Sequence, residues 1–192
     1  MGECLERINN CLEFLNLCKP KESPNNNNKQ ERSDSSYKLL NMSKYYTLLL
    51  PTRPKVNDEI RIKAKLNERP KEFILNLCVD SAIDDEDEPA MIAFHFKTKF
   101  KHHMDGNSSV VLTCKRGPNG WDDFEEIENT WIDDDVDEID VAIKFTKREI
   151  HFMSGGSSEY QFAHQYEIHR IDRLQIGGDL EYIEEVALRY KN

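Results

Sequence analysis

Residues 94 to 100 form a short segment in which aromatic and polar side chains alternate, Phe94-His95-Phe96-Lys97-Thr98-Lys99-Phe100. Successive side chains of a β-strand point to opposite faces, so this segment predicts a strand with two different faces. One face carries the three phenylalanines and Thr98, and we expect it to lie in a core. The other carries His95, Lys97 and Lys99, which form a row of hydrogen-bond donors on a rigid backbone.

Segments on both sides of this strand repeat the two-residue period. Apolar residues alternate with mostly charged ones over residues 60–66 and 139–145. Residues 73–79 and 110–112 are more continuously apolar, residues 171–176 add a further strand-like segment, and Gly155-Gly156 separates two strand-like segments, as in a β-hairpin. Roughly ten short strands at intervals of about ten residues predict an all-β sandwich or barrel.

The first 36 residues differ from the rest of the chain. Cys4, Ile8, Cys11, Leu15 and Cys18 recur at helical spacing, which predicts a short amphipathic helix. This helix is either a partly ordered extension or a docking or dimerising helix. Residues 20–36 contain no hydrophobic side chain, which predicts a disordered linker. We therefore divide the chain into a helix and linker (1–36) and a β domain (37–192).

Composition excludes several classes of protein. The 192 residues include 36 acidic and 26 basic ones, for a net charge of -10, whereas general nucleic-acid binding needs clustered positive charge. No apolar run approaches the ~18 residues of a membrane-spanning helix. The first residues lack the basic start and apolar core of a signal peptide. The five cysteines form no C-x-x-C pair, so we expect reduced thiols.

The sequence predicts neither a metal centre nor an active site. Histidine pairs such as His164 and His169 would point to opposite faces of a strand, and no cysteine lies at metal-binding spacing from them. The acidic residues of 84–88 and 122–140 lack the central glycine of a calcium loop, so we interpret them as solvated loops and charged strand edges. Motifs of serine hydrolases, nucleotide-binding loops and zinc proteases are missing. We therefore expect a protein that is not an enzyme and needs no cofactor.

Trp121 directly follows the turn Gly117-Pro118-Asn119-Gly120, downstream of the polar row. An exposed indole beside fixed polar side chains suits a sugar, because the apolar face of a pyranose stacks on the ring while polar groups bind its hydroxyls. A solvated strand face beside a tryptophan that only packs is the alternative interpretation of the same residues.

Several segments, in the right order, resemble the galectins, a family of β-galactoside-binding lectins. The resemblance covers about Tyr45 to Leu188. The matching segments are Tyr46–Pro51 (first strand), Asp58–Ala64 (Gly-Asp strand, with Asn57 in place of Gly), Phe73–Leu77 (F-x-I-N-L), His95–Phe100 (H-F-N-P-R-F), Gly120-Trp121 (the G-W turn) and Ile176–Leu180 (final Gly-Asp strand). The resemblance implies a jelly-roll sandwich of two antiparallel sheets, with sugar bound on the concave face of one sheet.

The resemblance also implies a sugar site in which most polar residues are replaced. Its residues in this sequence are His95, Lys97, Lys99, Thr113, Trp121, Phe124 and Glu126. Only the histidine and the tryptophan are kept. Lys97 and Thr113 stand for asparagine, Lys99 and Glu126 for arginine, and Phe124 for glutamate, although a one-residue bulge would instead bring Glu125 to the glutamate position.

These replacements change the chemistry of the implied site. Lysine cannot form the planar fork with which arginine holds a carboxylate. An amide both donates and accepts hydrogen bonds, whereas Lys97 only donates. Glu126 inverts a charge, and we expect it to pair with Lys97 or Lys99.

Two functions follow as hypotheses. The first is a lectin that binds a β-galactoside-type glycan, weakly or with altered specificity. The alternative is a galectin-fold interaction module that no longer binds sugar and meets protein partners through the acidic Asp122–Asp140 surface or the N-terminal helix. We expect no nucleic-acid partner and no membrane span, and the oligomeric state stays open. Free cysteines favour a cytoplasmic location, but galectins commonly reach the cell exterior without a signal peptide, so an extracellular location stays open too.

Overall fold

The structure, a computed structural model, describes residues 5–6, 45–80, 89–103, 106–117 and 120–191. The expected linker and the domain boundary near residue 37 lie outside these residues. Most of the expected N-terminal helix does too, and it is not supported where the structure describes the chain, because Leu5–Glu6 form a short strand. Neither of the two short 3-10 helices in the described part of the chain, η1 (Lys101–His103) and η2 (Ile168–Arg170), is long and apolar enough to cross a membrane.

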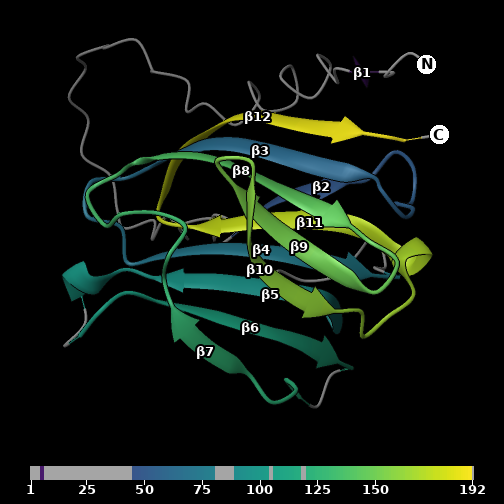
Figure 1. The fold of residues 1–192 in the computed structure, drawn as a ribbon, viewed down its shortest axis with the longest axis horizontal. Coiled ribbons are helices and arrows are strands. Elements are labelled where there is room, and N and C mark those ends of the chain that lie inside the picture. The colour runs from purple at the N-terminus through teal and green to yellow at the C-terminus, as the bar shows by residue number, and fades with distance from the viewer. Residues whose placement is uncertain (1–4, 7–44, 81–88, 104–105, 118–119, 192) are drawn as a thin grey trace, which may run out of the picture.

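Two six-stranded antiparallel sheets pack face to face (Figure 1). We name the first one sheet A; in spatial order it contains β1 (Leu5–Glu6), β12 (Leu180–Arg189), β3 (Glu59–Leu66), β8 (Glu138–Phe145), β9 (Glu149–Ser154) and β10 (Ser157–Ala163). Sheet B contains β2 (Tyr45–Leu49), β11 (Ile171–Gly178), β4 (Glu72–Val79), β5 (Met91–Lys99), β6 (Ser109–Arg116) and β7 (Glu125–Glu128). The all-β sandwich expected from the two-residue period is confirmed.

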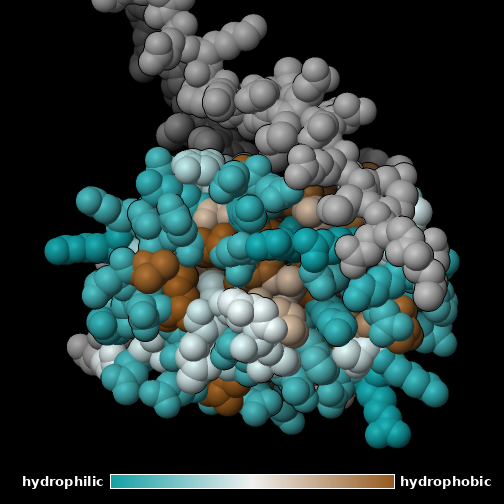
Figure 2. All heavy atoms as spheres, turned by 45° about the horizontal axis from the view of Figure 1, so that its top comes forward, coloured by the Kyte–Doolittle hydropathy of each residue, from teal (hydrophilic) through white to brown (hydrophobic). Residues whose placement is uncertain are grey.

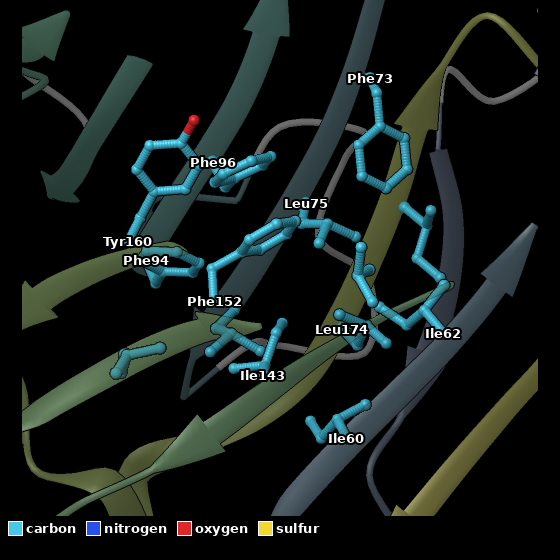
Figure 3. Close-up of a cluster of buried hydrophobic side chains, with 14 of the residues drawn as sticks. Ile60, Ile62, Phe73, Leu75, Phe94, Phe96, Ile143, Phe152, Tyr160 and Leu174 are labelled. Carbon is cyan, nitrogen blue, oxygen red and sulfur yellow. The ribbon is translucent and has the colours of Figure 1, made fainter. Parts of the chain in front are cut away.

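The core lies between the sheets and is rich in aromatic rings (Figure 3). Phe96 of β5 stacks on Phe152 of β9, with ring centroids 3.9 Å apart, and so joins the two sheets. Trp131 packs against both rings, and its buried Nε1 donates to the hydroxyl of Thr98 at 2.9 Å. That hydrogen bond explains why a threonine occupies the phenylalanine face of β5, because an unpaired indole N–H in the core would be costly.

A buried carboxylate anchors the start of β3. Asn57 adopts a left-handed backbone (φ 75°) at the place where the resembling family has glycine, and asparagine is among the side chains that tolerate this conformation. The next residue, Asp58, is 4% exposed and accepts the backbone N–H groups of Lys55 at 2.8 Å and Lys191 at 3.0 Å. The β2–β3 loop and the C-terminal end of the chain are thereby fixed to one another.

A second aspartate, Asp179, accepts backbone N–H groups where the chain passes from β11 of sheet B to β12 of sheet A. Gly178 has φ +96°, and a Cβ atom placed there would lie 2.2 Å from the carbonyl oxygen of Glu72. The carboxylate of Asp179 then accepts the backbone N–H of Lys71 at 2.6 Å. Only glycine permits this close approach of the two backbones.

The outer face of sheet A carries cross-strand ion pairs. Arg61 of β3 holds Asp140 of β8 through two hydrogen bonds, and Lys63 of β3 lies 3.6 Å from Glu185 of β12. Figure 2, turned so that the top of Figure 1 comes forward, shows mostly hydrophilic side chains with small, separate hydrophobic patches. The alternation of residues 60–66 thus separates a dry inner face from a charged outer one.

Candidate functional site

The outer face of sheet B carries a row of polar side chains across its middle strands. The strand register sets His95 of β5 opposite Asn76 of β4 and Thr113 of β6, and Asn76 opposite Gln175 of β11. All four side chains are at most 9% exposed. The pleat that buries Phe94 and Phe96 in the core is what turns His95 to this face.

Hydrogen bonds fix the orientation of the histidine. The amide Nδ2 of Asn76 donates to Gln175 at 3.1 Å, so its Oδ1 faces His95 Nδ1 at 2.7 Å as the acceptor. With the amide in this orientation, the Nδ1–H group of His95 donates to Asn76 Oδ1. The ring is therefore held in one orientation by Asn76 of the neighbouring strand β4, which is itself held by Gln175 of β11.

Trp121 lies beside this row, at the turn that follows β6. An isolated bridge to Lys115 places its backbone against the strand end, and the side chain is 44% exposed. Its ring centroid lies 4.6 Å from that of His95, with an angle of 59° between the ring planes. The Nζ of Lys115 lies 5.7 Å from the indole centroid, within the range of a cation–π contact. The structure thus brings together the two residues on which the sugar hypothesis depends.

The residue after the tryptophan is fastened by three side chains. Thr113 donates its hydroxyl to the carbonyl of Asp122 at 3.1 Å, and Arg116 Nε lies 2.6 Å from the Asp122 carboxylate. The Cys114 thiol donates to the same carboxylate at 3.1 Å. Burial raises the pKa of this thiol, and its hydrogen bond to Asp122 adds to the shift. The position of the Trp121 ring therefore rests on an anchored turn.

The predicted lysines both have carboxylate partners. Lys97 pairs with Glu72 of β4. Lys99 lies 3.0 Å from Glu126 of β7, which also accepts the Ser109 hydroxyl at 2.7 Å. Hydrogen bonds from Ser109 and Lys99 lower the pKa of the Glu126 carboxyl. This end of the face therefore consists of neutralised pairs instead of free cations.

The family of this chain follows from its similarity to known proteins. The sequence model described as galactoside-binding lectin matches residues 45–188, three quarters of the chain. The chain belongs to the galactoside-binding lectin family. Lectins bind sugars without catalysing a reaction, in agreement with the expectation that this protein is not an enzyme.

Solved galectin structures share the fold. Sheep galectin-11, determined in complex with glycerol, is 16% identical over 77% of this chain and 98% of its own, with a TM-score of 0.59. The galectin LEC-6 of Caenorhabditis elegans is 14% identical over 82% of this chain and all of its own, with a TM-score of 0.61. At these identities the likeness concerns the fold alone. No curated protein sequence matches the chain.

The strand register shows which of the two carboxylates, Glu125 or Glu126, shares a face with the polar row. Glu126 stands opposite Val111, which shares the outer face with Thr113, whereas Glu125 stands opposite the core residue Leu112. The Lys99–Glu126 contact therefore lies on the outer face of sheet B, and no register shift that would bring Glu125 to this face is observed between β6 and β7. Phe124 is 64% exposed and makes no ring contact with His95 or Trp121 within the described residues.

Four residues of this face escaped sequence reasoning: Asn76, Gln175, Glu72 and Ser109. Asn76 leaves a trace in the sequence, because it is the polar interruption of the apolar run 73–79. Gln175 leaves no comparable trace, because Asp172 and Arg173 also interrupt residues 171–176. Within the described residues, no group of three or more His, Cys, Asp or Glu side chains is arranged to hold a metal ion.

Proposed function

We propose that this chain binds a neutral β-galactoside-type glycan on the outer face of sheet B, with lower affinity or altered specificity relative to a galectin that keeps the full set of site residues. The observation that carries the proposal is the exposed indole of Trp121 in contact with the oriented ring of His95. The pair combines a stacking surface with a hydrogen-bonding group, the two elements that pyranose recognition requires.

The geometry of this pair argues for altered binding. A centroid separation of 4.6 Å is direct ring contact, so a pyranose does not fit between His95 and Trp121. The sugar stacks instead on the exposed surface of the indole, and its hydroxyls meet the edge of the polar row. Such stacking contributes about 1–2 kcal/mol by analogy with other aromatic contacts, which makes the remaining hydrogen bonds decisive.

The lysines argue for a neutral ligand. Lys97 and Lys99 already have Glu72 and Glu126 as partners, so an anionic glycan would have to displace a carboxylate to reach either amine. An anion that displaces a carboxylate exchanges one ion pair for another and gains little, since partly exposed pairs of this kind are worth roughly 0.2–1 kcal/mol. We therefore expect neutral galactosides to bind more tightly than their sulfated counterparts.

The test is a titration of the full chain with lactose and a panel of neutral and sulfated galactosides, followed by NMR or calorimetry. Trp121→Ala is expected to abolish binding, while Tyr182→Ala, which removes another half-exposed aromatic side chain on sheet A, is expected to leave it unchanged. Binding that persists in Trp121→Ala would show that the sugar uses a different surface.

The second candidate function is a galectin-fold interaction module without sugar binding. It is favoured by the surroundings of Trp121, since His95 packs against the ring and the Lys115 amine lies over it. The second function would be supported over the first by two results together. No glycan in the panel would shift an NMR resonance of a residue in the polar row, and the chain would not be retained on lactose-agarose.

A further inference from the structure

Unpaired positive charge gathers at one corner of this acidic protein. Five cationic residues at the end of β8 and beside it make no ion pair with any described residue: Lys55, Lys144, Lys147, Arg148 and Lys191. The Asp58 carboxylate binds the backbones of Lys55 and Lys191, and the Asn57 N–H donates to the Phe145 carbonyl at 2.7 Å. We call these five residues the basic corner.

A hollow adjoins the basic corner. It has a volume of about 610 Å³, and Lys55 and Lys147 both line it. Its one acidic side chain, Glu167, lies 3.3 Å from the Nε2 of His169, which also lines the hollow. Val56, which is 40% exposed, and Ile168 give it an apolar part. Cationic side chains around an apolar patch suit a segment that carries carboxylates next to an apolar side chain.

The chain presents such a segment at the opposite end of β8. Residues 133–136 form a turn closed by the Val136 N–H donating to the Asp133 carbonyl at 3.1 Å, and we call it the acidic turn. Asp134 anchors the turn, because its carboxylate accepts the Lys101 N–H at 3.1 Å and lies 3.2 Å from Lys101 Nζ. Asp133 and Asp135 are exposed and make no ion pair with described residues, and Val136 is 41% exposed.

We propose that the hollow beside the basic corner is the docking site for the acidic turn of a second copy of this chain. Asp133 and Asp135 of one copy then face Lys55 and Lys147 of the other, and Val136 packs against the apolar part of the hollow. The eight residues of β8 separate the two surfaces, which lie at its two ends (Figure 1). The contact is therefore head-to-tail and leaves one surface of each kind open, so that copies add into short chains or rings.

The lining of the hollow favours a peptide over a nucleic acid or a polyanionic sugar. The guanidinium carbon of Arg170 lies 5.6 Å from the ring centroid of Tyr166, one of the aromatic rings that line the hollow, so a base cannot stack on that face of the tyrosine. A sulfated sugar makes no use of Val56 and Ile168. A turn already held in shape by Asp134 loses little conformational entropy on docking.

The test measures the weight-average mass of the full chain by sedimentation over a range of concentrations at about 0.15 M salt, where the ~8 Å Debye length screens the repulsion between two chains of charge -10. The double variant Lys55→Glu/Lys147→Glu reverses the charge of the two lysines that line the hollow. The double variant Asp133→Lys/Asp135→Lys reverses the charge of the two exposed carboxylates of the acidic turn. Each double variant alone is expected to associate at least about tenfold more weakly than the native chain, because like charges then face each other.

A mixture of the two double variants gives the decisive result. The first variant still carries a native acidic turn and the second a native hollow, so a 1:1 mixture is expected to regain association. Lys71→Glu, a charge reversal outside both surfaces, and Trp121→Ala are expected to associate like the native chain. Three results would each overturn the proposal, whatever the outcome of the glycan titration. The native chain could stay monomeric, a double variant could associate as strongly as the native chain, or the mixture could fail to regain association.

Discussion

Gly178 shows how one residue fixes the connection between the two sheets. Alanine at this position would bring its Cβ to 2.2 Å from the Glu72 carbonyl oxygen, on a backbone with φ +96°. We expect Gly178→Ala to lower the free energy of unfolding by about 3 kcal/mol, since clash and backbone strain add. Urea unfolding of the native chain and of the variant measures this loss. Gly155→Ala is the matched control, because its φ is also positive (+56°) but its Cβ would meet nothing within 4 Å, so a cost of about 1 kcal/mol is expected. Equal losses for the two variants would contradict the role of the close approach.

Asn76 is the second position where a single side chain matters. Asn76→Ala removes the link between Gln175 and His95 and leaves buried polar atoms on both. We expect a loss of about 2–3 kcal/mol in unfolding free energy, because each unpaired buried group costs about 1–3 kcal/mol. Gln161→Ala, on the exposed edge strand β10, is expected to cost little. Unfolding free energies that match for the two variants would mean that water replaces the Asn76 amide without loss.

At the scale of elements, the sequence predicts strands well because their two faces meet different surroundings. The alternating segments 60–66 and 139–145 appear as β3 and β8, and the row of His95, Lys97 and Lys99 appears on β5. The sequence does not predict pairing between distant strands. Whether Glu125 or Glu126 faces the site depends on which residue of β6 stands opposite, and Lys97 finds Glu72 on a neighbour that is 25 positions away.

The Arg61–Asp140 pair couples β3 to β8 in a pH-dependent way. Hydrogen bonds from Arg61, at 2.7 Å from Nε, lower the pKa of the Asp140 carboxyl below its ordinary value. The folded state therefore binds a proton at this carboxyl less readily than the unfolded chain does. The stabilisation is present at neutral pH and is lost as pH falls through the folded pKa.

Asp140→Asn is accordingly expected to destabilise the protein at neutral pH and to flatten its loss of stability in acid. The carboxylate is 49% exposed, so the effect at neutral pH should stay below about 1 kcal/mol. Urea unfolding at neutral pH and at about pH 3 measures both parts, since an ordinary Asp titrates near 4. Asp123→Asn, which removes an exposed carboxylate without an ion pair to described residues, is the control. If the unfolding free energy of Asp140→Asn fell as much between neutral pH and about pH 3 as that of the native protein, the coupling would be ruled out.

At the scale of the whole molecule, the sequence predicts the features that depend on alternation along one strand. It does not predict the features that depend on contacts between distant segments. The inner faces of both sheets follow from the alternation of apolar residues, so the core was predictable as a set. The contact of Phe96 with Phe152 joins β5 to β9 across the sandwich, and the contact of His95 with Trp121 joins β5 to the turn after β6. Neither contact follows from spacing along the chain, because each depends on how distant segments pack.

Phe152 tests whether the two sheets form one cooperative unit. Its ring stacks on Phe96 of the opposite sheet and is fully buried, so Phe152→Ala removes an inter-sheet contact and leaves a cavity. We expect a loss of about 3–5 kcal/mol in unfolding free energy, with a single transition in both circular dichroism and tryptophan fluorescence. Phe124→Ala makes the same chemical change at a ring that is 64% exposed, and it should cost less than about 0.5 kcal/mol. If the two spectroscopic transitions of Phe152→Ala separated, each sheet would have to hold its structure without the other.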